Sequence, residues 1–253
     1  MFTRALVRTP GRSLVDGLTT AKLGQPKYSQ ALDQHAAYVE ALQACGVAVE
    51  ILPPLGDFPD ACFIEDVALL TPHCAIITRP GAPSRQGETS GMREILGRYF
   101  DVIEEIQAPG TLEGGDVLSI ESHYYIGLSG RTDPAGAGQL IEILGRYDLS
   151  GSTIPLRQIL HLKTGVAYLK QDNLLACGEL LSRQEFTGFN ILPIPEGESY
   201  AANCIWVNGT VLVPAGYPQT AGIIQEAGYP VREVDVSEFR KLDGGMSCLS
   251  LRF

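Results

Sequence analysis

Short apolar segments recur along the whole chain, and four of the stretches that contain them share one layout. Each begins with a polar loop, continues as an apolar strand, turns tightly and returns as a second apolar strand. These stretches occupy residues 63–78, 112–127, 160–178 and 201–214. In the fourth, Asn208 and Gly209 form a dipeptide typical of a hairpin turn. The pattern therefore predicts four copies of one β-hairpin.

A fifth copy is divided between the two ends of the chain. Residues 247–253 supply one apolar strand, after which the chain stops. Residues 4–8 supply an apolar strand that has no hairpin partner near it in the sequence. We therefore expect the two termini to pair with each other and to complete a fifth hairpin.

Each hairpin is followed by a predicted helix and then by another apolar strand. The helices are expected at 28–45, 88–99, 133–145, 179–186 and 218–227, and the strands at 47–52, 102–106, 153–159, 190–194 and 231–236. Asp133 and Pro134 suit an N-cap and first helical position, and Gly46 and Gly228 suit helix ends. The sequence thus predicts an α/β fold in which residues 1–253 form a single domain, a closed, five-bladed, pseudo-symmetric α/β propeller of ββαβ modules.

The polar loops of such a propeller converge on its axis. Their first polar residues are Glu65, Glu113, His161, Asn203 and Cys248, which lie 42 to 48 residues apart. This spacing predicts a central polar pocket that these residues share with Asp66 and Asp116. The pocket would combine a nucleophile, an acid or base and several carboxylates, the set needed for covalent chemistry on a cationic group.

None of these residues is diagnostic by itself. Cys248 alone is better explained as a buried apolar residue, and His161 alone as a partly buried imidazole with its hydrogen bonds satisfied. The acids alone are explained as solvated loop residues. Gly244 and Gly245 favour the functional interpretation, because glycine permits unusual dihedral angles and close backbone approach just before Cys248. His161 is the only one of four histidines in a polar loop of this kind.

Composition and charge narrow the classes of function. A net charge of -10 argues against binding to nucleic acid and favours cationic partners. No apolar run is long enough to span a membrane, and the amino terminus lacks the apolar core of a secretion signal. The six cysteines have no zinc-binding spacing, which indicates reduced thiols and predicts a cytoplasmic location.

Motifs from end to end resemble the dimethylarginine dimethylaminohydrolase family, whose guanidine-modifying superfamily has a five-bladed propeller called the pentein fold. The matching stretches include RTPGRSLVDGL, FPDACFIEDVALL, AIITRPGAPSRQGET, APGTLEGGDVL, LHLKTGVAYL, ESYAANCIWVN and KLDGGMSCLSLRF. The resemblance implies hydrolysis of asymmetric dimethylarginine or monomethylarginine to citrulline and a methylamine, through a covalent cysteine thiouronium intermediate. It implies no cofactor, no metal, a cationic amino acid as the small-molecule partner, and a monomer or homodimer.

The resemblance also implies roles for individual residues. Cys248 is expected as the nucleophile, His161 as the general acid and base, and Glu113 as the residue that orients or polarises. Seven residues are expected to bind the substrate, namely Leu18, Asp60, Glu65, Asp66, Arg85, Arg131 and Leu242. Among these, the acids would bind the positive charge and the two arginines the carboxylate. An arginine deiminase, another guanidine-modifying hydrolase and a non-catalytic binding protein on the same fold are the alternatives.

Overall fold

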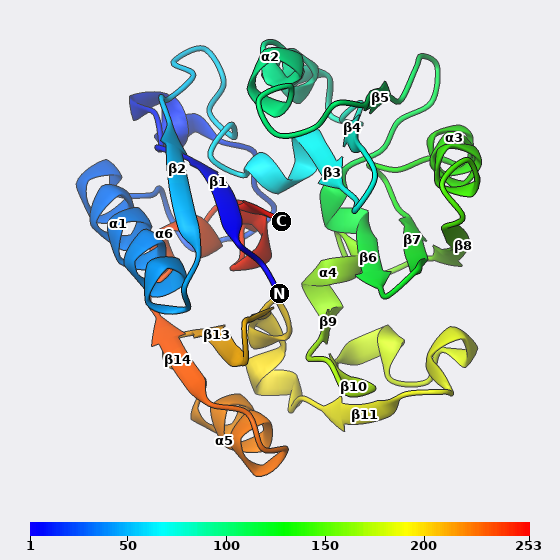
Figure 1. The fold of residues 1–253 in the computed structure, drawn as a ribbon. Helices are drawn as coiled ribbons and strands as arrows, with labels where there is room; N and C mark the ends of the chain where they lie inside the picture. The colour runs from blue at the N-terminus through cyan, green and yellow to red at the C-terminus, as the bar shows by residue number, and fades with distance from the viewer.

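Five separate three-stranded sheets surround a central axis in the computed structural model, which describes residues 1–253 (Figure 1). In every sheet an inner strand pairs antiparallel with a middle strand, which pairs parallel with an outer strand. The first two strands are the hairpin recognised in the sequence, and the third follows the outer helix. The predicted propeller of five modules is therefore confirmed.

The strands have the following bounds in the order of modules one to five. The inner strands are β3 (Ala68–Leu70), β6 (Val117–Ile120), β9 (Val166–Tyr168), β12 (Ile205–Val207) and β15 (Leu251–Arg252). The middle strands are β4 (Ala75–Ile77), β7 (His123–Leu128), β10 (Asn173–Ala176), β13 (Thr210–Pro214) and β1 (Arg4–Arg8). The outer strands are β5 (Ile103–Glu105), β8 (Ser150–Pro155), β11 (Asn190–Pro193), β14 (Val231–Val234) and β2 (Ala48–Leu52).

The chain termini pair as predicted and complete the fifth sheet. Strand β15 pairs antiparallel with β1, with Leu251 opposite Leu6, and both termini lie at the hub (Figure 1). The strand expected over 247–253 is shorter, however, because Ser247–Leu249 forms a 3-10 turn, η8. The amide of Ser247 donates to the Asn203 side chain at 2.8 Å instead of to a neighbouring strand. Cys248 therefore lies on a turn and not on a strand.

The longer helices lie on the outer side of the ring (Figure 1). They are α1 (Tyr28–Ala44), α2 (Met92–Leu96), α3 (Pro134–Gly145) and α5 (Pro218–Glu226), with a short α6 (Ser237–Arg240) before η8. Asp133 caps α3 as predicted, since its side chain accepts from the amide of Gly136 at 2.7 Å. None of the helices has the length and apolar content needed to cross a membrane.

Two predicted helices differ from the structure. The one expected at 88–99 is divided into a 3-10 helix, η3 (Pro83–Thr89), and α2, because Gly91 has a φ of 79°. The one expected at 179–186 is replaced by two 3-10 turns, η5 (Gly178–Leu180) and η6 (Gln184–Phe186). Leu180 and Phe186 are both fully buried, and residues six positions apart lie on different faces of an α-helix. Two separate turns bury both.

The hydrophobic core is divided among the five boundaries between neighbouring modules. Five buried clusters are present, and each combines side chains of at least two adjacent modules. In one of them, for example, Leu6 of β1 belongs to the same cluster as Ala75 and Ile77 of β4. Burial of apolar area is the main favourable term in folding, so most of the stabilisation arises between modules and depends on the closed ring.

A tight turn precedes the inner strand of every module at the hub. These turns are η2 (Ile64–Val67), η4 (Gly114–Asp116), α4 (Leu162–Gly165), η7 (Glu196–Ala202) and η8. Glu113 and His161 are the N-cap residues of η4 and α4, and Asn203 is the C-cap residue of η7. The polar residues that the repeat spacing singled out therefore all lie in or beside the hub turns, although at different positions in them: Glu65 and Cys248 lie within η2 and η8.

His35 is a buried polar residue of α1, a helix on the outer side of the ring (Figure 1). Its Nε2 atom is buried without a hydrogen-bond partner, and burial lowers the pKa of His35 to about 4. The unfolded chain binds the proton near pH 6.5, whereas the folded protein resists it. The stability that depends on neutral His35 is therefore complete above about pH 6.5 and is lost as the pH falls toward 4.

We predict that unfolding by urea shows this titration. Between pH 7 and pH 4.5, the free energy of unfolding of the wild type should fall by roughly 2 to 3 kcal/mol more than that of His35→Gln. The matched control, His73→Gln in the exposed turn after β3, should keep the wild-type slope. Equal pH slopes for the wild type and His35→Gln would contradict the prediction.

Candidate active site

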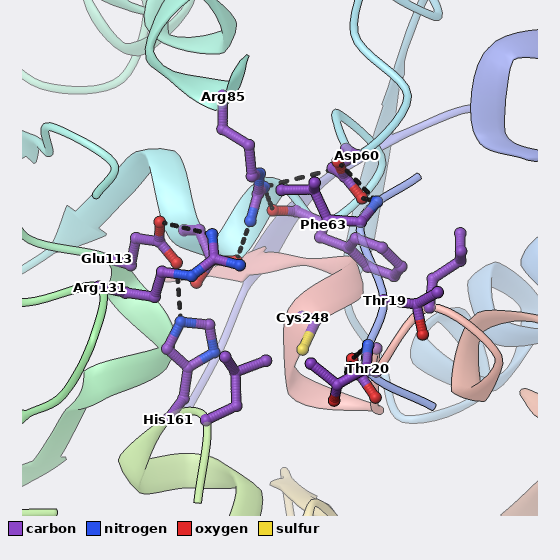
Figure 2. Close-up of a pocket in the computed structure, with 15 residues that line it drawn as sticks. Thr19, Thr20, Asp60, Phe63, Arg85, Glu113, Arg131, His161 and Cys248 are labelled. Carbon is purple, nitrogen blue, oxygen red and sulfur yellow. Dashed lines mark hydrogen bonds and ion pairs between the residues drawn. The ribbon is translucent and has the colours of Figure 1, made fainter. Parts of the chain in front are cut away.

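A cavity of about 160 Å³ opens at the hub and is lined by 15 residues (Figure 2). Nine of the ten predicted site residues line it, namely Leu18, Asp60, Asp66, Arg85, Glu113, Arg131, His161, Leu242 and Cys248. The sequence analysis missed six others, namely Thr19, Thr20, Phe63, Leu160, Asp243 and Gly244. Each of these six lies within two positions of a predicted site residue or of another of the six along the chain. That adjacency is the only signal of them in the sequence, except for Gly244, which was noted as a glycine that permits close backbone approach before Cys248.

Three residues expected in the pocket lie behind it. Glu65, Asp116 and Asn203 are buried but do not line the cavity. Glu65 instead accepts from Lys163 Nζ and from Ser247 Oγ, each at 2.6 Å, and lines a different cavity of the hub. Successive residues of a 3-10 turn point about 120° apart, so Glu65 and Asp66 of η2 face different sides. The expected contact between Glu65 and the substrate therefore has no support in its position.

His161 and Glu113 form the central pair of the cavity. His161 Nε2 lies 2.7 Å from Glu113 Oε2 (Figure 2). Burial alone would lower the pKa of His161, but the charges of Asp66 and Asp116 and the bond to Glu113 raise it to about 9. The imidazole is therefore protonated at neutral pH and can act as an acid.

Asp116 supports this pair from behind. Its Oδ1 accepts from the amide of Leu162 at 3.0 Å, and its Oδ2 accepts from Ser129 Oγ at 2.6 Å. Burial raises the pKa of Asp116. The bond to Leu162 holds the backbone next to His161.

Asp66 is held ionised by Arg85. Burial alone would raise the pKa of Asp66, but Arg85 NH1, at 2.6 Å from Oδ2, holds it at about 2. The amide of Gly115 donates to the other oxygen at 2.9 Å. A side chain at Gly115 would bring a Cβ to 2.9 Å from both Asp66 Oδ1 and His161 Nδ1, so only glycine allows this approach.

Arg85 has few hydrogen-bond donors left for a ligand. Glu88 accepts from its Nε at 3.0 Å and from its NH2 at 2.8 Å, and the carbonyl of Phe63 accepts from NH2 at 3.0 Å. Of the five N–H groups, one on NH1 has no protein partner. Glu88, three residues after Arg85, was not among the predicted site residues. The i, i+3 spacing of opposite charges was its only sequence signal.

Arg131 is the freer guanidinium. Its side chain is 23% exposed, and its contact with a carboxylate is the 3.5 Å approach of NH1 to Glu113 Oε1. Glu113 Oε1 also accepts from the amide of Gly81 at 3.0 Å. Arg131 therefore presents several unpaired N–H groups toward the cavity (Figure 2).

Cys248 is among the residues that line the cavity (Figure 2). Its Sγ accepts a hydrogen bond from the amide of Gly245 at 3.4 Å. Burial and the negative charges of Glu65 and Asp66 nevertheless raise the pKa of the thiol to about 12. The sulfur is therefore a neutral thiol in the empty cavity at neutral pH.

A loop after η1 (Arg12–Asp16) covers one side of the cavity. The carboxylate of Asp60 accepts from the amide of Leu18 at 3.1 Å, and that of Asp243 accepts from the Thr20 hydroxyl at 3.0 Å. Burial raises the pKa of Asp60. Leu18 itself is 40% exposed, so the loop is held by its backbone and hydroxyls and not by apolar packing.

Comparisons with known proteins identify the family. The family model described as "N,N dimethylarginine dimethylhydrolase, eukaryotic" matches residues 19–186. The N(G),N(G)-dimethylarginine dimethylaminohydrolase of Pseudomonas aeruginosa is 57% identical, and the alignment covers 100% of both chains. The chain belongs to the dimethylarginine dimethylaminohydrolase family. A relative of the same name from Streptomyces coelicolor is 38% identical over 98% of this chain and 96% of its own.

Solved structures agree with the fold of this dimethylarginine dimethylaminohydrolase family member. A cysteine-to-serine variant of DDAH from Pseudomonas aeruginosa, complexed with citrulline, superposes with a TM-score of 0.99 at 56% identity over 100% of both chains. The N-terminal domain of ArgZ, a cyanobacterial arginine dihydrolase, has a TM-score of 0.90 at 20% identity over 100% of this chain and 97% of its own. The second likeness shows the fold alone.

Three side chains of this family member could supply metal ligands. One donor atom each from Asp66, Glu113 and His161 lies within 4.8 Å of the others. However, Arg85 and Gly115 already occupy the Asp66 oxygens, and His161 Nε2 is bonded to Glu113. A metal ion would have to displace a guanidinium and break these bonds, so we assign no metal role to the group.

The charges around Cys248 predict that a cation in the cavity promotes its ionisation, because an opposite charge favours the thiolate. Guanidinium ion at millimolar concentration should lower the apparent pKa of the thiol from about 12. Urea, which has the same shape without the charge, should not. The measurement is the ultraviolet absorbance of the thiolate against pH, as the difference between the wild type and Cys248→Ser. A pH profile that is the same with guanidinium and with urea would argue against this effect.

Proposed function

We propose that this protein hydrolyses N-omega-methylated arginines, such as asymmetric dimethylarginine, to citrulline and a methylamine. The observation that carries the proposal is the shared cavity of Cys248, His161 and two ionised or hydrogen-bonded carboxylates, Asp66 and Glu113. A guanidinium is flat and positively charged, and paired carboxylates bind it through short charge-assisted hydrogen bonds. Full-length relatives named for this activity give the same assignment.

The positive charge of the substrate is assigned to acidic residues of the cavity lining, and its carboxylate to arginines. Asp66 and Asp60 bind the positive charge, since each carboxylate oxygen has a second acceptor site beyond its bond to the protein. Arg131 is the main partner of the substrate carboxylate, and Arg85 contributes its one remaining N–H. Leu18 and Leu242 line the cavity and exclude water from the bound molecule.

The first chemical step forms a bond between Cys248 and the guanidinium carbon. The bound cation lowers the pKa of the thiol, which loses its proton to solvent, and the thiolate adds to the carbon while Asp66 and Glu113 hold the group in plane. Protonated His161 donates its proton to the departing amine as the carbon–nitrogen bond breaks. The product is a thiouronium adduct on Cys248 and a free methylamine.

The second step releases citrulline. Neutral His161 removes a proton from water, and the oxygen adds to the adduct carbon. The carbon–sulfur bond then breaks, and the remaining proton of the added water passes to the Cys248 sulfur, which restores the thiol and leaves the neutral carbonyl of citrulline. His161 regains in this step the proton that it lost in the first, so one imidazole serves as both acid and base, and no cofactor enters the balance.

Location and assembly remain proposals. All six cysteines are free thiols, which supports a reducing compartment such as the cytoplasm. The charge of -10 supports a cationic small molecule as the partner and not a nucleic acid. A monomer or a homodimer is the expected assembly.

We predict that turnover passes through an adduct on Cys248. Acid quenching during hydrolysis of dimethylarginine should trap a mass increase on the peptide that contains Cys248, together with equal amounts of citrulline and dimethylamine. Cys248→Ser should give neither adduct nor product, whereas Cys45→Ser, at a half-buried free thiol, should behave as wild type. Faster hydrolysis of arginine than of dimethylarginine would favour an arginine deiminase, and no product from either would favour a binding protein.

Substitution of Arg131 tests the substrate class better than substitution of Arg85. Loss of Arg85 would leave Asp66 and Glu88 unpaired and would destabilise the protein by roughly 3 to 5 kcal/mol. Arg131→Ala should raise KM for dimethylarginine by about 10- to 100-fold, equivalent to about 1.4 to 2.8 kcal/mol. Agmatine lacks the carboxylate, so its slow hydrolysis should not change. The control is Arg93→Ala at the surface, where the side chain is 59% exposed. The assignment fails if Arg131→Ala handles both substrates as wild type does.

A further inference from the structure

Asn203 joins the turn that carries Cys248 to the turn that carries His161. Its Oδ1 accepts from the amide of Ser247, the residue before Cys248, at 2.8 Å. Its Nδ2 donates to the carbonyl of Lys163, two residues after His161, at 3.0 Å. One carboxamide therefore bonds to the backbone of both turns, from a third module of the ring.

Side-chain bonds close this connection into a circuit. Asn203 Nδ2 also lies 3.2 Å from Ser247 Oγ, which donates to Glu65 Oε2 at 2.6 Å. Lys163 Nζ donates to the other oxygen of Glu65 at 2.6 Å. Asn203, Ser247 and Glu65 are each at most 7% exposed. A buried circuit in which the polar atoms have partners is rigid, because each broken bond leaves a buried group unpaired.

Asn203 also packs against the residue that donates to the sulfur. A Cβ at Gly245 would lie 2.5 Å from Asn203 Cγ and 2.6 Å from Oδ1, so the glycine backbone rests directly on the carboxamide. The amide of Gly245 donates to Cys248 Sγ at 3.4 Å. The Asn203 side chain therefore supports the Cys248 turn through Gly245 as well as through Ser247.

None of these three residues can act by touching the substrate. Asn203, Ser247 and Glu65 do not line the cavity, whereas the residues assigned to substrate binding do. Glu113 and His161 precede the hub turns of their modules and line the cavity, whereas Asn203 follows the hub turn of the fourth module and lies behind the cavity.

We propose that Asn203 is a positioning residue that fixes Cys248 relative to His161. The proposal rests on the proposed function, since it assumes that the sulfur and the imidazole act on one substrate. A misplacement of about 1 Å between reacting groups can reduce turnover about 100-fold. Loss of the brace should therefore lower kcat and leave affinity for an unreactive ligand unchanged.

The chain offers a matched control in Asn208. Its Oδ1 accepts from the amide of Phe2 at 2.8 Å, and its Nδ2 donates to the carbonyls of Phe2 and Cys45 at 2.8 and 3.0 Å. Asn203→Asp and Asn208→Asp each keep the acceptor for a backbone amide and remove the donors. The two changes are therefore alike in shape and charge, but only one is next to the catalytic turns.

The experiment measures kcat, the Kd of citrulline and the free energy of unfolding for both variants. We expect Asn203→Asp to lose about 10- to 100-fold in kcat with a citrulline Kd within about twofold of wild type. Asn208→Asp should keep kcat within about twofold. Asn203→Ala shows whether the loss comes from misplacement of Cys248 or from the charge of the new carboxylate. It should lose kcat to a similar extent without adding a carboxylate near Cys248.

Several outcomes would overturn the proposal. They are a wild-type kcat in folded Asn203→Asp, an equal loss of kcat in Asn208→Asp, a citrulline Kd that weakens by the same factor as kcat, and an active Asn203→Ala. If the Asn203 variants do not fold, Ser247→Ala is the deciding variant, because it removes only the hydroxyl that links Asn203 to Glu65. An unchanged kcat in Ser247→Ala would also overturn the proposal. A wild type that forms no adduct on Cys248 would refute the proposed function instead.

Discussion

The pairing of β1 with β15 is the contact on which the rest of the structure depends. Each buried cluster lies between modules, so an open ring would expose apolar faces that the fifth module buries against the fourth and the first. The same pairing holds the last seven residues of the chain at the hub, with Ala5 opposite Arg252. Closure therefore contributes twice, since it completes the core and it brings the terminal cysteine to the other modules.

Charge balance at the hub explains why ionisation of Cys248 depends on a bound cation. Arg85 pairs with both Asp66 and Glu88, but one guanidinium balances the charge of only one carboxylate. Burial raises the pKa of Glu88 to about 7. Asp60, Glu113 and Asp243 also line the cavity, where Arg131 and protonated His161 are the other cations. Negative charge thus remains uncompensated near Cys248. That excess disfavours the thiolate in the empty cavity and favours it once a positively charged ligand is bound.

The hub has two sides with different tasks. Cys248, His161 and Glu113 face the cavity, where their atoms are accessible to a small molecule. Behind them, Asp116, Asn203 and the pair of Glu65 with Lys163 hold the turns together. The chain thus uses polar residues both to react and to hold the reacting residues, and rigid buried bonds suit the second task because their geometry is fixed.

The sequence by itself determined the repeated unit, the joined termini and the approximate place of the hub residues along the chain, because hairpin signals, helix caps and apolar periodicity are local. Only the tertiary structure decided which side of the hub each residue faces. Glu65 and Asp66 are adjacent in the chain, yet one binds Lys163 behind the cavity and the other lines it. The partners of Arg85 were likewise undetermined, since contacts such as that with Asp66 depend on the packing of separate turns. Local patterns fix a residue's place along its element, but the direction of its side chain depends on what packs around it.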